Sequence, residues 1–318
     1  MLTLAHLSDV HLAPMPRPRI VDLSLKRAFG YANWHRKRKR IHLAATLERM
    51  IADMQAQRPD HIAVTGDLVN IGLPGEFATA TRWLHDLGPP AHVTVVPGNH
   101  DAYVRMRQDP GYLRWADYMA GNDPHLVPPE GTLFPFVKRL DEIVLIGVSS
   151  AVPTPPLAAT GRLGADQRAR LAEVLRALRG ETCFRVLLIH HPPLPGQAGR
   201  IRGLTDAAEL SDILRQDGVE LVLHGHNHRP MLHWAHGPHG RIPVVGVPSS
   251  SVGRAVHDPL ARYNLFRIRR SDTAWHLEMT ARGLADADGP VHEIEHLSLP
   301  VPHGEAQGLK RARTLSTR

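Results

Sequence analysis

The sequence places imidazole, carboxylate and amide side chains directly after five short apolar runs. Short apolar runs bounded by turn residues predict buried β-strands. In an open α/β sheet, ligands bind outside the carboxyl ends of the strands, so we expect these side chains to meet at one edge. Nitrogen and oxygen donors of this kind suit divalent Mn, Fe, Zn or Co. The predicted site residues are Asp9, His11, Asp67, Asn99, His100, His190, His226 and His228.

The spacing within two of these segments favours a metal site. Asp9 and His11 are two residues apart, and at an extended strand end such side chains point the same way. His226 and His228 have the same stagger, and Asp67 has two carboxylate oxygens that can bridge two cations. Two cations about 3.5–4 Å apart that share a carboxylate and a hydroxide form a hydrolytic site for phosphate esters. We therefore expect two divalent metal ions.

The same chemistry needs a proton donor and makes no use of thiolates. A hydrolase of this kind requires a group that protonates the leaving oxygen, and His100 suits that role. The only cysteine, Cys183, follows none of these motifs and is expected to be a buried thiol. A lone cysteine forms no internal disulfide, and soft-metal or structural zinc sites are not favoured.

The elements that must position these residues alternate between strands and helices in the first half of the chain, and strands dominate later. This order predicts an α/β fold, a sandwich of two mixed β-sheets flanked by helices in one domain. We expect the domain to span residues 1–282, with a basic and aromatic insertion at about 13–42, and a polar, disordered tail at 283–318. The predicted strands are 2–8, 61–65, 93–96, 133–140, 143–149, 184–189, 219–223, 231–235, 242–247, 263–269 and 274–280, and the predicted helices are about 23–40, 42–57, 74–87, 111–119, 165–178 and 206–216.

The motifs D-x-H, G-D, G-N-H-[DE], H-x-P and G-H-x-H follow one another between Asp9 and His228. In this order they resemble the calcineurin-like metallophosphoesterases, over roughly two thirds of the chain. The resemblance implies a four-layer αββα sandwich, two metal ions, and a phosphodiester or pyrophosphate substrate. It also implies that His100 contacts the substrate phosphate and protonates the leaving group. One metal would be held by Asp9, His11, Asp67 and His228, and the other by Asp67, Asn99, His190 and His226.

Several polar residues near the motifs keep more than one interpretation. His190 is favoured as the ligand because it ends an apolar strand and precedes x-Pro, whereas His191 either contacts the substrate or only packs. His224, at a strand end, is expected to be structural. Asp101 either orients a neighbour or closes the turn. Residues 249–251, three serines, are expected to turn the chain rather than to line the pocket.

One position departs from the family pattern. Three residues after Asp67, many relatives place a carboxylate that orients the proton-donating histidine, and this chain has Asn70 there. We expect the Asn70 side-chain carbonyl to accept a hydrogen bond from His100 without adding a charge. Because an anionic partner favours the imidazolium form, His100 is then less strongly held in that form.

The net charge of +7 is concentrated near the N-terminus. Residues 1–42 contain nine Lys or Arg and two Asp, and the rest of the chain contains 29 basic and 29 acidic residues. Segment 17–42 follows a strand end of the site, so we expect it at the rim. It is a solvated helix whose apolar face packs on the body, an interfacial helix on anionic lipid, or a nucleic-acid contact with aromatic rings stacked on bases. The predicted apolar face of its helix consists of Leu25, Ala28, Phe29 and Ala32.

These interpretations separate four functions. The family resemblance favours a phosphodiesterase acting on a small soluble substrate, such as a 3′,5′-cyclic nucleotide. A membrane-surface hydrolase of a lipid-linked pyrophosphate would resemble the UDP-2,3-diacylglucosamine hydrolases, although one branch of those enzymes has Arg at the position of His100. A nuclease is less favoured because the body of the chain lacks a long basic track. A metal-binding scaffold or inactive adaptor is disfavoured because no ligand position is missing.

The start of the sequence has neither the basic nor the apolar region of a signal peptide, and no apolar run approaches the length of a membrane span. We therefore expect a cytoplasmic protein, or one that binds peripherally at the inner face of the membrane. The Pro-, Ala- and Gly-rich loop 151–163 is expected to be a lid or a partner surface.

Overall fold

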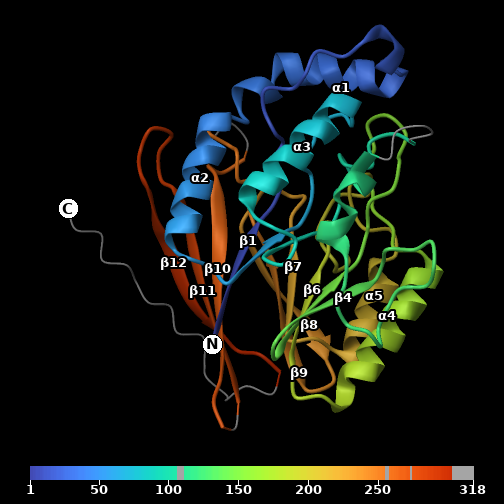
Figure 1. Cartoon of the computed structure of the whole chain (residues 1–318), viewed down its shortest axis with the longest axis vertical. Coiled ribbons are helices and arrows are strands. Elements are labelled where there is room, and N and C mark those ends of the chain that lie inside the picture. The colour runs from blue at the N-terminus through green and yellow to red at the C-terminus, as the bar shows by residue number, and fades with distance from the viewer. Residues whose placement is uncertain (106–110, 255–257, 273, 303–318) are drawn as a thin grey trace.

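The computed structural model describes residues 1–105, 111–254, 258–272 and 274–302. Two mixed β-sheets of six strands each pack face to face, and helices lie on their outer sides (Figure 1). The predicted α/β sandwich of two mixed sheets is therefore confirmed.

The first sheet joins the N-terminal strand to strands from the C-terminal part of the chain. Its order is β12 (Val291–Leu299), β11 (Trp275–Leu284), β10 (Arg262–Arg270), β1 (Leu2–Leu7), β2 (His61–Val64) and β3 (Val93–Val95). β1, β2 and β3 are parallel, and β10, β11 and β12 are antiparallel to their neighbours. The parallel half carries the ligand segments of this sheet.

The second sheet has a parallel centre and two antiparallel edges. Its order is β4 (Phe136–Leu140), β5 (Ile143–Gly147), β6 (Phe184–Leu188), β7 (Leu221–His224), β9 (Gly240–Gly246) and β8 (Met231–Gly237). β5, β6, β7 and β9 are parallel, whereas β4 pairs with β5 as the predicted hairpin and β8 pairs with β9.

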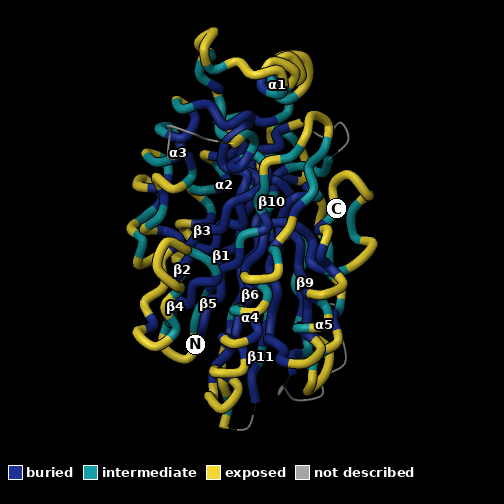
Figure 2. Tube along the Cα trace, turned by 90° about the vertical axis from the view of Figure 1, so that its right-hand side faces the viewer, coloured by how far each residue is buried: buried dark blue, intermediate teal, exposed yellow. Residues whose placement is uncertain are grey.

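The central strands of the second sheet are apolar on both faces, which explains their uninterrupted apolar runs. In β6, Val186 and Leu188 belong to the core shared with the first sheet, whereas Leu187 packs in a second core under the helices. Parallel strands covered on both sides bury every side chain in this way. Figure 2 shows the buried strands as one continuous dark region.

The helices flank the sheets as expected. The α-helices beside the sheets are α2 (Ala44–Ala56), α3 (Pro74–Leu87), α4 (Ala165–Ala177) and α5 (Ala207–Asp217), and the short 3₁₀ helices are η1 (Ile20–Asp22), η2 (Arg38–Arg40), η3 (Gly111–Met119) and η4 (Leu178–Gly180). α2 packs on β10 and β12, and α5 packs on β8 and α4. None of the described helices combines the length and the apolar composition that crossing a bilayer requires.

α1 (Leu25–Arg36) lies beyond the end of the sandwich at which β1 finishes (Figure 1). The Ser24 hydroxyl caps it by accepting from the Arg27 backbone N–H at 3.3 Å. Trp34 anchors the helix in a small apolar cluster. The other members of that cluster are Met15, Ile71 and Leu73, with Tyr31 and Tyr103 packed against it.

Of the three interpretations of this segment, the one in which the apolar face of the helix packs on the body is contradicted. Leu25 and Phe29 are 71% and 60% exposed, and the two alanines of that face are exposed as well. Hydrogen bonds set the orientation instead, because the buried Arg27 guanidinium donates to the Ile71 and Gly72 carbonyls. A buried guanidinium needs such acceptors, so the side of the helix that carries Arg27 and Trp34 faces the protein.

The C-terminal part also corrects the sequence analysis. Residues 283–318 were expected to form a disordered tail, but β12 (Val291–Leu299) pairs along β11 and buries Leu297 and Leu299. Alternate side chains of β12 are polar because that face is only partly covered, which made the segment look irregular. The rest of the expected tail, 303–318, lies outside the described residues.

Candidate metal centre

The predicted ligands come from five segments and meet at the end of the sandwich where the parallel strands finish. The segments follow β1, β2 and β3 in the first sheet and β6 and β7 in the second. A single parallel β-bridge between Ser8 and Ser249 joins the two sheets at this end of the sandwich. All seven predicted ligands are buried: Asp9, His11, Asp67, Asn99, His190, His226 and His228.

One half of the cluster consists of Asp9, His11 and His228 together with Asp67. His228 Nε2 lies 3.1 Å from Asp9 Oδ1 and 3.4 Å from His11 Nε2. His11 Nε2 in turn lies 3.9 Å from Asp67 Oδ2. Two imidazole nitrogens and two carboxylates therefore surround one space.

The other half also includes Asp67. His190 Nε2 lies 3.5 Å from Asp67 Oδ2 and 3.1 Å from Asn99 Oδ1. His226 Nδ1 lies 2.8 Å from the same Asn99 oxygen. Asp67 Oδ2 thus has His11 on one side and His190 on the other, which is the position of a bridging carboxylate.

The backbone at these ligands is not the extended strand end that the sequence analysis assumed. Asp9 and His11 have φ values of 53° and 39°, and Asp67 has 56°. His226 and His228 have 70° and 52°. Residues other than glycine rarely adopt the left-handed region, and such strain concentrates at functional sites. The side chains still converge, but tight left-handed turns bring them together.

Two glycines of the motifs are required by close packing of these turns. A Cβ at Gly98 would collide with the Asp67 carboxylate. A Cβ at Gly225 would collide with the Ser8 hydroxyl and lie 2.5 Å from Asp9 Oδ2. The G-N-H-D and G-H-x-H motifs therefore carry glycine because a carboxylate ligand lies directly against the backbone.

Second ring nitrogens hold three of the imidazoles in place. His11 Nδ1 donates to the Val69 carbonyl at 3.1 Å, and His190 Nδ1 donates to the Thr65 carbonyl at 2.6 Å. These bonds occupy each Nδ1 and direct each Nε2 into the cluster, which is the orientation that metal-binding histidines require.

Asp258 holds the third imidazole and was missed in the sequence analysis. His228 Nδ1 donates to Asp258 Oδ2 at 3.2 Å. A carboxylate in this position orients a ligating histidine and raises its basicity. Asp258 follows no strand and belongs to no motif, so the sequence offered no signal for it.

Asp101 fixes the loop that carries Asp67. Its two carboxylate oxygens accept from the backbone N–H groups of Asp67, Leu68, Val69 and Gly98 at 2.8–3.2 Å. Of the two interpretations of Asp101, the structure favours orientation of a neighbour.

Two of the three serines after β9 contact residues of the cluster or next to it. Ser249 Oγ donates to the Asp9 carbonyl at 2.6 Å. Ser251 Oγ lies 2.8 Å from His42 Nδ1, and His42 has a ring nitrogen close to those of His11 and His228. His42 ends the basic segment in the sequence and was not predicted as a site residue.

The carboxylates of the cluster favour positive charge at two of its imidazoles. Burial opposes protonation of His190, but the Asp67 and Asp9 carboxylates outweigh it and raise its pKa to about 9. Burial is likewise outweighed at His228, where Asp9 and Asp258 raise the pKa to about 9. Donor atoms of Asp9, Asp67 and His190 also lie within 4.8 Å of one another. Donor chemistry, spacing and field all fit divalent cations.

His100 lies beside the cluster, but its hydrogen-bond partner differs from the expected one. Its Nδ1 donates to the backbone carbonyl of Asn70, whereas the Asn70 side-chain amide donates to the Leu12 carbonyl at 3.0 Å. The expected bond to the Asn70 side chain is therefore wrong, because the loop turns that side chain away. Burial, and then the nearby Arg38 charge, lower the pKa of His100 to about 3.

His191 and His224 have structural contacts. His191 Nδ1 lies 2.7 Å from Ser150 Oγ, and its Nε2 donates to the Ala159 carbonyl at 3.1 Å. Because both ring nitrogens have partners in the protein, the structure favours the interpretation in which His191 packs. His224 is fully buried with Nδ1 3.0 Å from the Gly225 carbonyl oxygen, which fits the structural role expected from the sequence.

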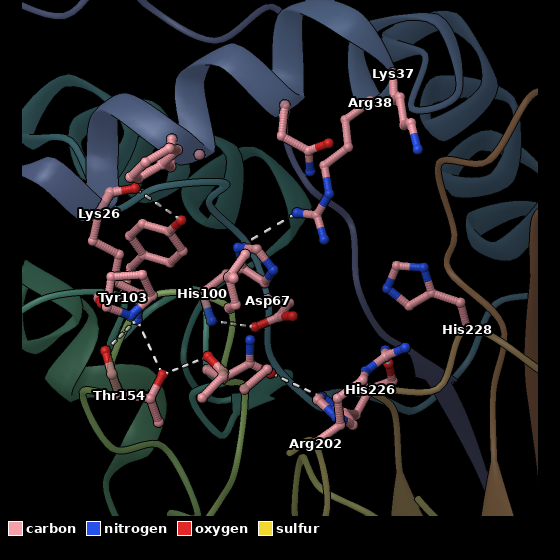
Figure 3. Close-up of a pocket in the computed structure, with 18 of the residues that line it drawn as sticks. Lys26, Lys37, Arg38, Asp67, His100, Tyr103, Thr154, Arg202, His226 and His228 are labelled. Atoms are coloured by element: carbon pink, nitrogen blue, oxygen red, sulfur yellow. Dashed lines mark hydrogen bonds between the residues drawn. The ribbon is translucent and has the colours of Figure 1, made fainter. Parts of the chain in front are cut away.

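A pocket of about 480 Å³ opens over the cluster (Figure 3). Asp67, His226 and His228 form its floor, and the α1 segment forms one wall, as the predicted rim position requires. The loop 151–163 contributes Thr154 and residues 156–159 to the opposite side. Figure 3 shows Arg38 pointing from the α1 side toward His100 and Asp67.

The profile of the calcineurin-like phosphoesterase family matches residues 2–230. A probable cyclic nucleotide phosphodiesterase from Synechococcus sp. is 25% identical over 206 residues, which cover 64% of this chain and 69% of that protein. A cAMP/cGMP dual specificity phosphodiesterase from Mycobacterium tuberculosis is 28% identical over 234 residues, which cover 71% of this chain and 61% of that protein.

Among solved structures, a dimetal phosphatase from Danio rerio has a similar fold. The TM-score is 0.58 at 13% sequence identity, over 92% of this chain and 98% of that one. At this identity the likeness shows the fold alone. Because the family profile covers most of the chain, and because the five motifs meet in one cluster, the chain belongs to the calcineurin-like phosphoesterase family, whose metal-dependent phosphoester hydrolysis the motifs predicted.

Proposed function

We propose that the protein is a dinuclear metal-dependent phosphodiesterase. One observation carries this proposal: Asp67 Oδ2 lies 3.9 Å from His11 Nε2 and 3.5 Å from His190 Nε2, so one oxygen can bridge two cations. The proposed ligands are Asp9, His11, Asp67 and His228 for one ion and Asp67, Asn99, His190 and His226 for the other.

The chemistry follows from these ligands and their supports. When bound, two such cations supply Lewis-acid polarisation of the phosphate and a lower pKa for water. The imidazole and carboxylate set suits Mn, Fe, Zn or Co, and we propose that the native metals belong to this group. Fixed orientations of His11, His190 and His228 keep the donor atoms in place without reorganisation during the reaction.

We propose that His100 contacts the substrate phosphate and protonates the leaving oxygen. Its Nδ1 proton is committed to the Asn70 carbonyl, so Nε2 is the nitrogen available to the pocket. An approaching anionic phosphate favours the imidazolium form and raises the pKa of His100 from its low value. The proton on Nε2 can then pass to the leaving oxygen.

For the substrate we propose a phosphodiester, with a 3′,5′-cyclic nucleotide as the first candidate. The names of the two relatives support this choice. A pocket of about 480 Å³ is also in the range of small-molecule sites.

Hydrolysis by the Mn²⁺-loaded protein tests this proposal. The substrates are bis(p-nitrophenyl) phosphate, cyclic AMP, a glycerophosphodiester and a phosphomonoester. We expect diester hydrolysis, and His100→Ala should lower kcat at least about 100-fold with little change in KM. His125→Ala, an exposed histidine away from the pocket, is the matched control. No diester turnover, or unchanged turnover in His100→Ala, would contradict the proposal.

We also propose that the N-terminal cap, residues 17–42, binds an anionic membrane surface. Ile20 and Val21 are 90% and 85% exposed, next to the exposed Leu25 and Phe29. Leu157, across the pocket mouth, is 90% exposed. Clustered exposed apolar side chains of this kind mark interaction sites. Exposed cations accompany them in the cap: Arg36, Lys37, Lys39 and Arg40.

Apolar and basic groups together match an anionic lipid surface. Each Lys or Arg near such a surface contributes about 1 kcal/mol, and apolar side chains add to this by entering the acyl boundary. The pocket would then open toward lipid headgroups, at the inner face of the membrane of a cytoplasmic protein. This arrangement favours a lipid-linked pyrophosphate as the second candidate substrate.

Co-sedimentation with vesicles tests the membrane proposal. We expect binding to phosphatidylglycerol-containing vesicles at low salt, weaker binding at high salt, and none to pure phosphatidylcholine. Leu25→Ser with Phe29→Ser should weaken binding at least about fivefold. Leu113→Ser removes a 50% exposed leucine on η3 and should have no effect. Equal weakening by both changes, no vesicle binding, or self-association through the cap would contradict it.

A further inference from the structure

Four cationic side chains line the pocket in addition to the proposed metal ligands: Lys26, Lys37, Arg38 and Arg202. Lys26 has a structural role, because its Nζ donates to the Tyr103 and Thr154 carbonyls at 2.7 and 2.8 Å. Within the described part of the chain, no carboxylate lies at ion-pair distance from the other three.

Arg38 is half-buried and its charge is not compensated by an ion pair. Its Nη1 lies 3.4 Å from His100 Nδ1, but that ring nitrogen already donates its proton to the Asn70 carbonyl. The guanidinium therefore gains no good hydrogen bond from His100. Burying a guanidinium whose N–H groups make no hydrogen bonds costs free energy, and a bound anion that accepts from these groups removes that cost.

Arg202 lies on the other side of the cluster from Arg38 in Figure 3. Its Nη2 donates to the His226 carbonyl at 3.3 Å, and within the described part of the chain its remaining N–H groups make no hydrogen bond, so they can bind a ligand. Lys37 precedes Arg38 and is exposed at the pocket mouth. The three cations thus flank the floor of the pocket rather than cover one point.

The charges of the pocket exceed what one phosphodiester can neutralise. Two divalent cations bring four positive charges, which Asp9, Asp67 and the shared hydroxide would reduce by three, and the single negative charge of a phosphodiester balances the fourth. Asp258, the remaining carboxylate in the pocket lining, is engaged by His228 at 3.2 Å. Lys37, Arg38 and Arg202 therefore complement a further anionic group on the substrate.

We propose that Lys37, Arg38 and Arg202 form an anion subsite beside the metal centre, which binds a second phosphate group of the substrate, as in a pyrophosphate diester. The subsite rests on the proposed metal-dependent hydrolysis, and it favours the second candidate substrate class, a pyrophosphate, over a cyclic nucleotide, which has a single phosphate. Arginine forks match phosphate oxygens in geometry as well as in charge.

The corresponding reaction is hydrolysis of the anhydride. Water supplies the oxygen that forms a new P–O bond at the phosphorus over the metal centre, and the P–O bond to the bridging oxygen breaks. The electron pair leaves with the bridging oxygen, so the second phosphate departs as a phosphate monoester. The protons of water pass to the two products and to solvent, and the arginines stabilise the charge that develops on the departing group.

Calorimetric binding to the Mn²⁺-loaded protein tests the subsite without turnover. The probes are AMP, with one phosphate, and α,β-methylene-ADP, a non-hydrolysable ligand with two. We expect the second phosphate to increase affinity at least about 30-fold. Arg38→Gln or Arg202→Gln should each reduce this advantage about tenfold, and Lys37→Gln about threefold.

Lys39→Gln is the matched control. Lys39 lies in the same short segment and is exposed, but it does not line the pocket and contacts His35 instead. Unchanged thermal unfolding of each variant shows that the fold is intact, and the two arginines come from separate segments, so one misfolded variant leaves the other as a test.

Equal affinities for the two probes would overturn the subsite, as would equal losses in Lys39→Gln and in the arginine variants. Aryl diester hydrolysis is measured separately. Failure of hydrolysis with a preserved two-phosphate advantage would contradict the proposed function, whereas hydrolysis without that advantage would contradict only the subsite.

Discussion

The floor and the α1 wall of the pocket use their polar side chains in opposite ways. On the floor, His11, His190 and His228 each donate one ring proton to a protein oxygen and direct the other nitrogen inward. On the wall, Arg27 holds the helix by donating to backbone carbonyls, while Phe29 remains exposed. The floor is thus preorganised for ions, whereas the wall leaves cations and apolar groups available for larger partners.

The largest effect is expected from breaking the centre of the floor. Asp67→Asn removes the charge of the shared oxygen and should reduce the bound metal below two ions per chain. Turnover should fall at least about 1,000-fold, because about 4 kcal/mol of transition-state stabilisation is lost. Metal analysis with kinetics measures both, and Asp86→Asn on the exposed side of α3 is the control. Full occupancy with normal turnover would show that Asp67 bridges nothing.

A smaller effect is expected one step away from the metals. Asp258→Asn keeps the shape of the group that orients His228 but removes its charge. Metal affinity or activity should fall about 10–100-fold, with unfolding unchanged. Competition with a metal indicator dye gives the affinity. An affinity equal to that of the native protein would assign Asp258 to the surface rather than to the centre.

Substitutions of two residues of α1 test which face of this helix packs on the protein. Arg27→Met removes hydrogen bonds to the carbonyls of Ile71 and Gly72 and should destabilise the protein by about 2–3 kcal/mol. Phe29→Ser removes an exposed side chain and should change stability by less than about 0.5 kcal/mol. Urea unfolding of the two variants measures the difference. A larger loss in Phe29→Ser would mean that the apolar face does pack on the protein.

The smallest effect concerns a histidine that has no carboxylate beside it. Burial, and then the charges of Lys138 and His92, lower the pKa of His61 to about 3. Its neutral form is stable in the fold above pH 6.5, and this stability is lost as the pH falls toward 3. At pH 5 the cost is about 2 kcal/mol, from 1.5 pH units below the usual pKa.

His61→Gln, which keeps a donor toward Thr94 Oγ1, should therefore lose less stability than the native protein between pH 7 and pH 5. Urea unfolding at the two pH values measures this. An identical loss in both proteins would show that acid sensitivity comes entirely from the other histidines.

The residues that meet in the candidate metal centre could be predicted from the sequence because each follows a short apolar strand, and strand ends of parallel sheets converge. The backbone conformation of Asp9 and His226 could not, since left-handed turns by non-glycine residues leave no residue signature. Asp258 was missed because its partner is distant in the chain. The face of α1 was assigned wrongly because hydrophobic spacing ignores the hydrogen bonds that a buried Arg27 demands.

Electron paramagnetic resonance of the protein titrated with Mn²⁺ tests the central claim most directly, since exchange coupling appears only when two ions share a bridge. We expect saturation at two Mn²⁺ per chain with a coupled-pair spectrum, which reverts to an uncoupled signal in Asp67→Asn. Saturation at one ion, or two ions with uncoupled spectra in the native protein, would contradict a centre built around the Asp67 carboxylate.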